Sequence, residues 1–295
     1  MNSQKLIHLL VRILNRLPHF VTLNTALILG RLGYCVYRSQ RELALQNIRA
    51  CYPRDSYSLH KQIAIRAFQH IATSVIELLR FSDEKHHIRP CIKVRDLHYI
   101  TEAVSNGRGA VLMTAHYGNV GILPFALEGI CKEPAYIMRR STRRVGWVVA
   151  QFRAYREKYL KPKSSFHSLE SSIRGAIRAG HLLKQGNVVM VVADLTWGSS
   201  AIPLTFLGIP HNMSRAPASL SVLTNAPLIP VITSRNTDGT YEVVVEPPIE
   251  NPLGASRHDA ERIMTENFAK TLERHVSSRP EQWFWMHHHG HRATS

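Results

Sequence analysis

A histidine that directly follows a buried strand is the first residue in this sequence suited to catalysis. The run from Gly109 to Ala115 is almost entirely apolar, and His116 follows it, just before Gly118 and Asn119. Strands that are apolar on both faces belong to parallel sheets covered by helices, and ligands bind beyond the carboxyl ends of such strands. An imidazole at that place can transfer a proton near neutral pH. A structural histidine that caps a turn is the alternative.

A second apolar strand ends in a carboxylate. Gly186 and Asn187 introduce the run Val188 to Ala193, and Asp194 follows it. Strand ends on one edge of a parallel sheet share a crevice, so Asp194 can meet His116 there. A carboxylate beside an imidazole fixes the ring tautomer and stabilises the imidazolium cation. The two strand ends therefore predict a general base with its supporting acid.

Arginines follow a third short strand, which we predict from Pro134 to Met138. Forked guanidinium donors suit phosphate or carboxylate, so the cluster is a candidate site for the anionic group of a substrate. A solvated basic loop is the alternative. The predicted substrate-binding residues are Arg139, Arg140 and Arg143 of this cluster, together with Tyr117, Gly118 and Arg215.

The elements that must position these residues alternate between strand and helix, which is typical of an α/β fold with a mostly parallel sheet flanked by helices. Two further strands are predicted at residues 228–233 and 241–245, the second as an antiparallel edge strand. Helices are predicted at residues 41–51, 59–80 with Ser58 as the N-cap, 145–159, 171–184, 214–223 and 258–276. Residues 195–210 are predicted to form a loop.

The N-terminal residues are apolar, but charges and a proline interrupt them. Apolar positions from Leu6 to Leu17 fall at helical spacing, and Pro18 breaks the pattern. The uncharged stretch between Arg16 and Arg31 covers only residues 17–30, which is shorter than the roughly 20 residues needed to cross a bilayer. We predict that residues 1–38 form amphipathic helices in the headgroup region of a membrane. A pair of ordinary core helices is the alternative.

The composition favours an anionic partner. The 295 residues contain 37 Lys and Arg against 21 Asp and Glu, a formal net charge of +16. Such an excess suits nucleic acid, an acidic lipid surface or an acidic carrier protein. No metal, nucleotide or nucleic-acid-binding motif is evident, so neither a cofactor nor a nucleic-acid partner is expected. The four cysteines are widely spaced, as expected of reduced thiols on the cytoplasmic side.

Several short motifs in order resemble the late lipid A acyltransferases, the lauroyl/myristoyl-transferase-like members of the lysophospholipid acyltransferase group. The resemblance covers about residues 1–288. It is carried by Arg41-x-x-Ala44-x-x-Asn47-Ile48, Cys51-Tyr52-Pro53, Thr114 to Asn119, Val192-Ala193-Asp194, Pro203 to Pro210, Ala226 to Pro230, and Pro280 to His287.

The resemblance implies transfer of an acyl group from an acyl carrier protein or CoA thioester to a lipid hydroxyl, on the cytoplasmic face of a Gram-negative inner membrane. It implies His116 as general base, with Asn119 and Asp194 as further catalytic candidates, an acidic carrier protein as partner, and a lipid A-like or other glycolipid or phospholipid acceptor. The implied domains are a membrane-associated region at 1–38, an acyltransferase-like α/β domain at 39–288 and a tail at 289–295.

The chain departs from this family at one position. The family pattern places Asp or Glu five positions after the histidine, where this chain has Gly121. Asp194 is the predicted replacement, and Glu128 is a less favourable one because a helix from Asn119 would carry it away from the site. Three functions remain open: an active acyltransferase, a relative that transfers an aminoacyl or other carrier-bound group, and a non-catalytic membrane-surface protein.

Overall fold

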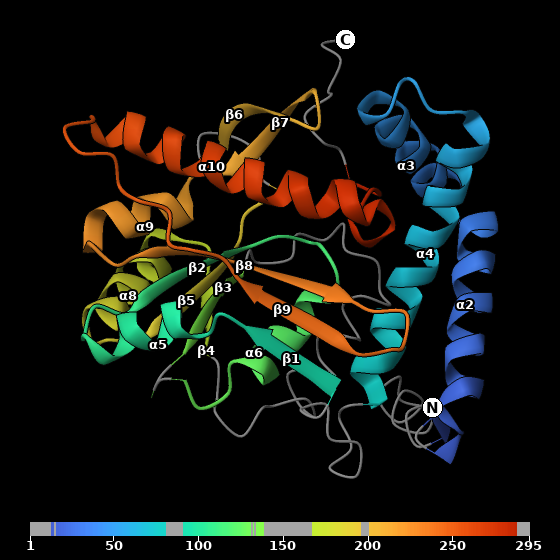
Figure 1. The fold of residues 1–295 in the computed structure, drawn as a ribbon, viewed down its shortest axis with the longest axis horizontal. Helices are drawn as coiled ribbons and strands as arrows, with labels where there is room; N and C mark the ends of the chain where they lie inside the picture. The colour runs from blue at the N-terminus through green and yellow to red at the C-terminus, as the bar shows by residue number, and fades with distance from the viewer. Residues whose placement is uncertain are drawn as a thin grey trace.

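A mainly parallel β-sheet forms the centre of the protein (Figure 1). The computed structural model describes residues 13–14, 16–80, 91–130, 132, 134–138, 167–195 and 201–287. Five neighbouring strands of the sheet run parallel: β8 (Leu228–Arg235), β2 (Ala110–Thr114), β5 (Val188–Val192), β3 (Ala135–Met138) and β4 (His167–Glu170). β9 (Tyr241–Val245) is antiparallel to β8, and β1 (Ile92–Arg95) lies parallel to β9 at the edge.

Alternate residues of the central strands pack into two hydrophobic cores, because successive side chains of a strand point to opposite faces. In β2, Val111 and Met113 join the first core, whereas Ala110 and Leu112 join the second. The first core contains residues from α8 (Ile173–Lys184), α9 (Ala216–Thr224) and α10 (Arg257–Ser278). The second contains residues from α5 (His98–Ser105), the short helix η2 (Val120–Ile122) and α6 (Leu123–Ala126). The sheet is thus covered on both faces, as its apolar strands require.

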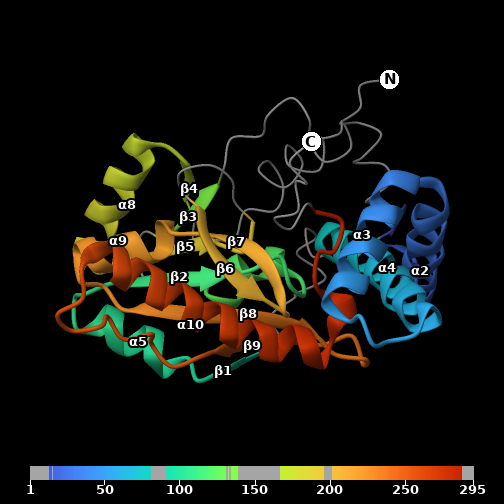
Figure 2. The same cartoon turned by 90° about the horizontal axis from the view of Figure 1, so that it is seen from above.

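Three N-terminal helices gather to one side of the sheet, as Figures 1 and 2 show. They are α2 (His19–Val36), α3 (Arg38–Cys51) and α4 (Tyr57–Arg80). Gly30 lets α2 approach α4 closely, because a Cβ there would lie 2.4 Å from the Cα of Gln69. No single helix among the described residues is long and apolar enough to cross a membrane. The bent pair α2 and α3, with a 92° break, meets that criterion only when the two are taken together.

The structure confirms the predicted α/β class and the strands that precede His116 and Asp194. Two predictions that concern strands were wrong. Residues 201–214 form an antiparallel hairpin of β6 (Ala201–Phe206) and β7 (Ile209–Ser214), so the part of the predicted loop from 201 to 210 is not a loop. Both turn residues, Leu207 and Gly208, have positive φ, as a tight hairpin turn requires. β9 is antiparallel as predicted, but β1 covers it, so it is not an edge strand.

The N-cap prediction for α4 also needs correction. The helix begins at Tyr57, which places Ser58 within its first turn. The hydroxyl of Ser56 accepts the hydrogen bond from the backbone N–H of Leu59 at 3.3 Å. The predicted helices at residues 6–17 and 145–159 fall wholly or mainly outside the described residues. The domain boundaries at residues 38 and 288 stay predictions.

Candidate active site

His116 and Asp194 meet at the carboxyl ends of the neighbouring parallel strands β2 and β5. Nδ1 of His116 lies 2.8 Å from Oδ1 of Asp194, and the backbone N–H of His116 donates to Oδ2 at 3.0 Å. The register explains the meeting, because Thr114 pairs with Val192 and each functional residue follows its strand by two positions. The sheet therefore places the two side chains together although 78 positions separate them.

Asp194 is completely buried and is surrounded by donors. Besides the two hydrogen bonds from His116, its Oδ2 accepts one from Nε1 of Trp283 at 3.0 Å. Its backbone carbonyl accepts a hydrogen bond from Nε2 of His211 at 2.8 Å. A buried carboxylate is costly unless charge and hydrogen bonds compensate, and here both are present. Ring and carboxylate thus form one fixed unit.

The electrostatics of this unit favour an ionised acid beside a basic imidazole. Burial alone would raise the pKa of Asp194, but the neighbouring His116 and the hydrogen bonds from His116 and Trp283 hold it well below its usual range. Burial alone would lower the pKa of His116, but the charge and hydrogen bond of Asp194 raise it above its ordinary value of 6.5. The ring is therefore a stronger base than a free imidazole.

The second ring nitrogen of His116 is placed to react. Since the carboxylate of Asp194 can only accept, Nδ1 carries a proton in the neutral ring and Nε2 carries the lone pair. The side chain is 41% exposed, in contrast to its buried partner. Within the described residues no hydrogen bond engages Nε2. The arrangement suits proton abstraction from a substrate group at Nε2.

The C-terminal segment binds the backbone around His116. The N–H of Gly118 donates to the carbonyl of Gln282 at 2.9 Å, and the N–H of Phe284 donates to the carbonyl of His116 at 3.1 Å. The amide of Asn47 in α3 donates to carbonyls of that segment, at 2.8 Å to Trp285 and 2.7 Å to His287. The Asn47 motif and the aromatic C-terminal motif therefore meet in space.

A second buried polar network lies behind the same turn. The amide Nδ2 of Asn119 donates to the carbonyl of Ser74 at 3.3 Å and to the hydroxyl of Tyr241 at 3.1 Å. That hydroxyl also donates to Glu77 of α4. Glu77 accepts hydrogen bonds from Nε and Nη2 of Arg235 at 2.7 to 3.1 Å. Sheet strands and α4 thus fix the turn that follows His116.

Position 121 faces α4 in this structure. A Cβ on Gly121 would lie 2.6 Å from Cδ1 of Leu78 and 3.3 Å from Oδ1 of Asn119. Leu78 is itself buried, so it has little room to move. The position at which the family carries its acid is therefore filled by packing, and Asp194 supplies the carboxylate that contacts His116.

Three further predicted site residues take part in the packing and hydrogen bonding of the turn that begins at His116. Asn119 is buried in the network with Tyr241, where its amide supports the turn that follows His116, and its catalytic role stays a prediction. Tyr117 is buried and its hydroxyl donates to the carbonyl of His275 at 2.9 Å, and its role in substrate binding stays a prediction. Gly118 packs closely, because a Cβ would lie 2.0 Å from the carbonyl oxygen of Thr233, and its N–H is already engaged.

The arginine predictions divide into two groups. Arg139, Arg140 and Arg143 lie outside the described residues. Arg215 precedes α9, and the neighbouring Ser214 donates its backbone N–H to the carbonyl of Ala193 at 2.8 Å, which brings this turn beside Asp194. Its side chain is about one-third exposed and lies 3.9 Å from Glu261. Arg215 thus stays a candidate for binding an anionic substrate group.

No sequence pattern indicates the contacts that Trp283 and Glu77 make. Trp283 lies within the aromatic C-terminal motif, but nothing in that motif indicates a hydrogen bond to Asp194. Glu77 lies between the apolar residues Ile76 and Leu78 of α4, and its charge is easily taken for a solvated one. No group of three or more His, Cys, Asp or Glu suited to a metal ion occurs among the described residues.

Comparisons with known proteins give two likenesses. The family model for bacterial lipid A biosynthesis acyltransferases matches residues 4–289. Among solved structures, the 1-acyl-sn-glycerophosphate (LPA) acyltransferase PlsC from Thermotoga maritima is similar at 15% sequence identity and a TM-score of 0.39, over 88% of this chain and 96% of that one. A comparison with curated proteins finds no match.

Proposed function

The chain belongs to the bacterial lipid A biosynthesis acyltransferase family, and from this premise we propose that it transfers an acyl group from a carrier thioester to a lipid hydroxyl with His116 as general base. Membership makes it an acyltransferase acting on lipids. The His116–Asp194 pair carries the rest of the proposal, since an exposed imidazole backed by a buried carboxylate is the group that such a reaction needs.

The proposed chemistry follows from the two ring nitrogens. Nε2 of His116 removes the proton of the lipid hydroxyl as its oxygen attacks the thioester carbonyl carbon. Asp194 stabilises the imidazolium through Nδ1. When the tetrahedral intermediate collapses, the carbon–sulfur bond breaks and the imidazolium returns the proton to the leaving thiolate. Free thiol and acylated lipid are the products, and the base is restored.

The surface charge supports the two kinds of anionic partner. A net charge of +16 attracts an acidic acyl carrier protein, and it also attracts an anionic lipid surface or the phosphates of CoA. Arg215, beside the end of β5, is proposed to bind an anionic group of the acceptor lipid, together with Arg139, Arg140 and Arg143. Either a lipid A-like molecule or another phospholipid or glycolipid acceptor fits this chemistry.

An exposed apolar face on α2 supports a location at the membrane surface, which we propose is the cytoplasmic face of the inner membrane. Thr22, Ala26, Gly30 and Tyr34 form the buried side of the helix. The large exposed apolar residues of α2 are Phe20, Ile28, Leu29, Leu32 and Val36. Such a helix can lie in the headgroup region with its apolar side in the acyl boundary.

An acyl-transfer assay tests the proposed reaction. Purified protein is incubated with acyl carrier protein or CoA thioesters of several chain lengths and with lipid A precursors or phospholipids, and products are read by mass spectrometry. We expect acylated lipid from the parent and a loss of 10²- to 10⁴-fold for His116→Ala, the range typical of general base catalysis. His258→Ala, at an exposed position of α10, is the control. Equal activity in parent and His116→Ala would reject the proposed base.

Vesicle flotation tests the membrane proposal separately. Leu32→Glu/Val36→Glu places two charges on the exposed face of α2, and we expect weaker binding to phosphatidylglycerol vesicles than for the parent. Leu253→Glu, at a fully exposed apolar residue outside α2, is the matched control and should bind like the parent. Unchanged binding by the double variant would contradict the role of α2.

A further inference from the structure

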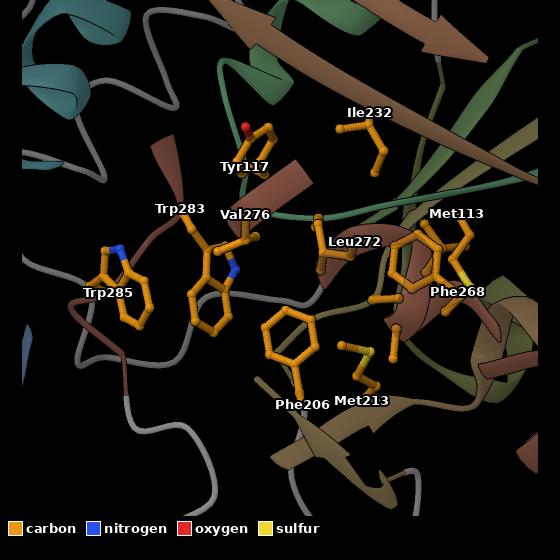
Figure 3. Packing of buried hydrophobic residues seen from close by; sticks show 14 of the residues in the cluster. Met113, Tyr117, Phe206, Met213, Ile232, Phe268, Leu272, Val276, Trp283 and Trp285 are labelled. Atoms are coloured by element: carbon orange, nitrogen blue, oxygen red, sulfur yellow. The ribbon is translucent and has the colours of Figure 1, made fainter. Parts of the chain in front are cut away.

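Two buried tryptophans in the C-terminal segment have different hydrogen-bond acceptors. The rings of Trp283 and Trp285 lie edge to face, 4.7 Å between centroids at 79°. Nε1 of Trp285 donates to the backbone carbonyl of Pro280 at 2.7 Å, whereas Nε1 of Trp283 donates to Oδ2 of Asp194 at 3.0 Å. Figure 3 shows the indoles in the packed core, with Phe206 below Trp283. Only one of the two indoles contacts the candidate active site.

We propose that Trp283 is a positioning residue for acyl transfer: its indole N–H holds Oδ2 of Asp194 so that Oδ1 faces Nδ1 of His116. This inference rests on the proposed function of the His116–Asp194 pair. Nε1 of Trp283 lies 3.0 Å from one carboxylate oxygen, and Nδ1 of His116 lies 2.8 Å from the other. Each carboxylate oxygen thus has its own donor, which fixes the orientation of the carboxylate group.

The burial of Asp194 explains why this donor matters. The residue has no exposed surface, so water cannot solvate its charge. The donors that replace water are the backbone N–H and Nδ1 of His116 and the indole N–H of Trp283. Hydrogen bonds to ionised groups are stronger than neutral ones, and a buried charge that loses a donor is not compensated by solvent. The indole therefore reduces the negative potential that the carboxylate exerts on the imidazole.

The indole is held in place before substrate binds. Its ring packs 5.0 Å from the ring of Phe206 and 4.7 Å from that of Trp285. The residues on either side of Trp283 make backbone hydrogen bonds: the carbonyl of Gln282 accepts from Gly118, and the N–H of Phe284 donates to the carbonyl of His116. A donor fixed by its own packing requires no reorganisation when the imidazole becomes charged, which is the property that a supporting group in an active site needs.

A matched pair of variants tests the inference. Trp283→Phe removes the donor to Asp194, whereas Trp285→Phe removes a similar buried indole with a donor to a backbone carbonyl. We expect Trp283→Phe to lower kcat about tenfold at neutral pH, with KM nearly unchanged, because the loss affects the base and not substrate binding. Its kcat/KM profile should move to higher pH, because a carboxylate with fewer donors favours the imidazolium. Trp285→Phe should leave both unchanged.

A readout without substrate separates this inference from the proposed reaction. The His116 ring is followed by NMR in histidine-labelled protein, its resonance assigned by its loss in His116→Gln. We expect the midpoint of its titration to rise in Trp283→Phe and to stay at the parent value in Trp285→Phe. An unchanged or lower midpoint overturns the inference, and so does equal kcat in the two variants when the parent is active. An inactive parent with the expected titration shift contradicts the proposed function alone.

A second substitution applies if Trp283→Phe does not fold. The amino acid β-(3-benzothienyl)alanine at position 283 keeps the bicyclic ring and replaces the N–H by sulfur, so packing is retained and only the donor is lost. The same replacement at position 285 is the control. The expected and contradicting results are those given for the phenylalanine pair.

Discussion

Two buried carboxylates hold the turn from His116 to Asn119, and their partners differ. Asp194 binds the imidazole of His116 directly, and 41% of the surface of that side chain is exposed. Glu77 pairs with the permanent cation Arg235, only 12% exposed, and reaches Asn119 through Tyr241. One centre retains a ring nitrogen that can react, whereas the other has its charge fully paired. Burial of an acid therefore does not identify a reactive site, but burial beside a titratable and exposed partner does.

Among the variants that keep His116, neutralising Asp194 should have the largest effect on activity. Asp194→Asn keeps the size of the side chain but removes the charge that supports the imidazolium, so we expect kcat to fall by up to about 10⁴-fold, and by no more than in His116→Ala. Rates of acyl transfer at saturating substrate measure the change, with circular dichroism to establish folding. A loss below tenfold would mean that Asp194 has a mainly structural role, like that of Glu77.

Neutralising Glu77 should affect stability instead. Glu77→Gln leaves Arg235 buried without its partner, which typically costs about 3–5 kcal/mol in unfolding free energy. Denaturant unfolding measures this loss, and activity per folded molecule should remain close to that of the parent. Glu42→Gln, which breaks the exposed Arg38–Glu42 pair, is the control and should cost less than about 1 kcal/mol. A stable but inactive Glu77→Gln protein would place Glu77 in the reaction.

An acid placed at position 121, where the family pattern has one, should not restore the activity that Asp194→Asn loses. A side chain at Gly121 meets Leu78, and overpacking of this kind costs about 1–3 kcal/mol. We expect the single variants Gly121→Asp and Gly121→Asn to be less stable than the parent. The double variant Gly121→Asp/Asp194→Asn should be as slow as Asp194→Asn. Gly180→Asp in α8, where a Cβ meets only Thr224 at 3.8 Å, is the control. Regained activity in the double variant would show that position 121 can support the imidazole.

The smallest effect concerns pH. A general base must be neutral, so activity is lost as pH falls through the pKa of His116, which Asp194 raises above 6.5 despite the opposing effect of burial. The half-maximum of kcat/KM should therefore lie above pH 6.5 in the parent. In Asp194→Asn only the effect of burial remains, and the half-maximum should move to lower pH. Identical half-maxima in the parent and Asp194→Asn would show that Asp194 does not raise the pKa of His116.

The sequence was sufficient to bring His116 and Asp194 together, because two apolar strands in one parallel sheet must end at one edge. It did not reveal the contact of Trp283 with Asp194, since these residues lie 89 positions apart and no periodicity links them. The hairpin at residues 201–214 contains Pro203, and a proline within a run of residues argues against a strand because it has no N–H to donate. Pro203 is exposed and belongs to a two-stranded sheet, where a missing N–H is tolerated. Local patterns thus predicted the strands, whereas tertiary packing decided the partners of the buried polar groups.

A double-mutant cycle on acyl transfer tests the central claim most directly. If Asp194 acts only through His116, the variant His116→Ala/Asp194→Asn should be no slower than His116→Ala alone, because residues that work as one unit lose their effect together. Rates of all four proteins under the same conditions supply the comparison. A double variant that is slower than His116→Ala by the full factor of Asp194→Asn would contradict the claim that the two residues form one base.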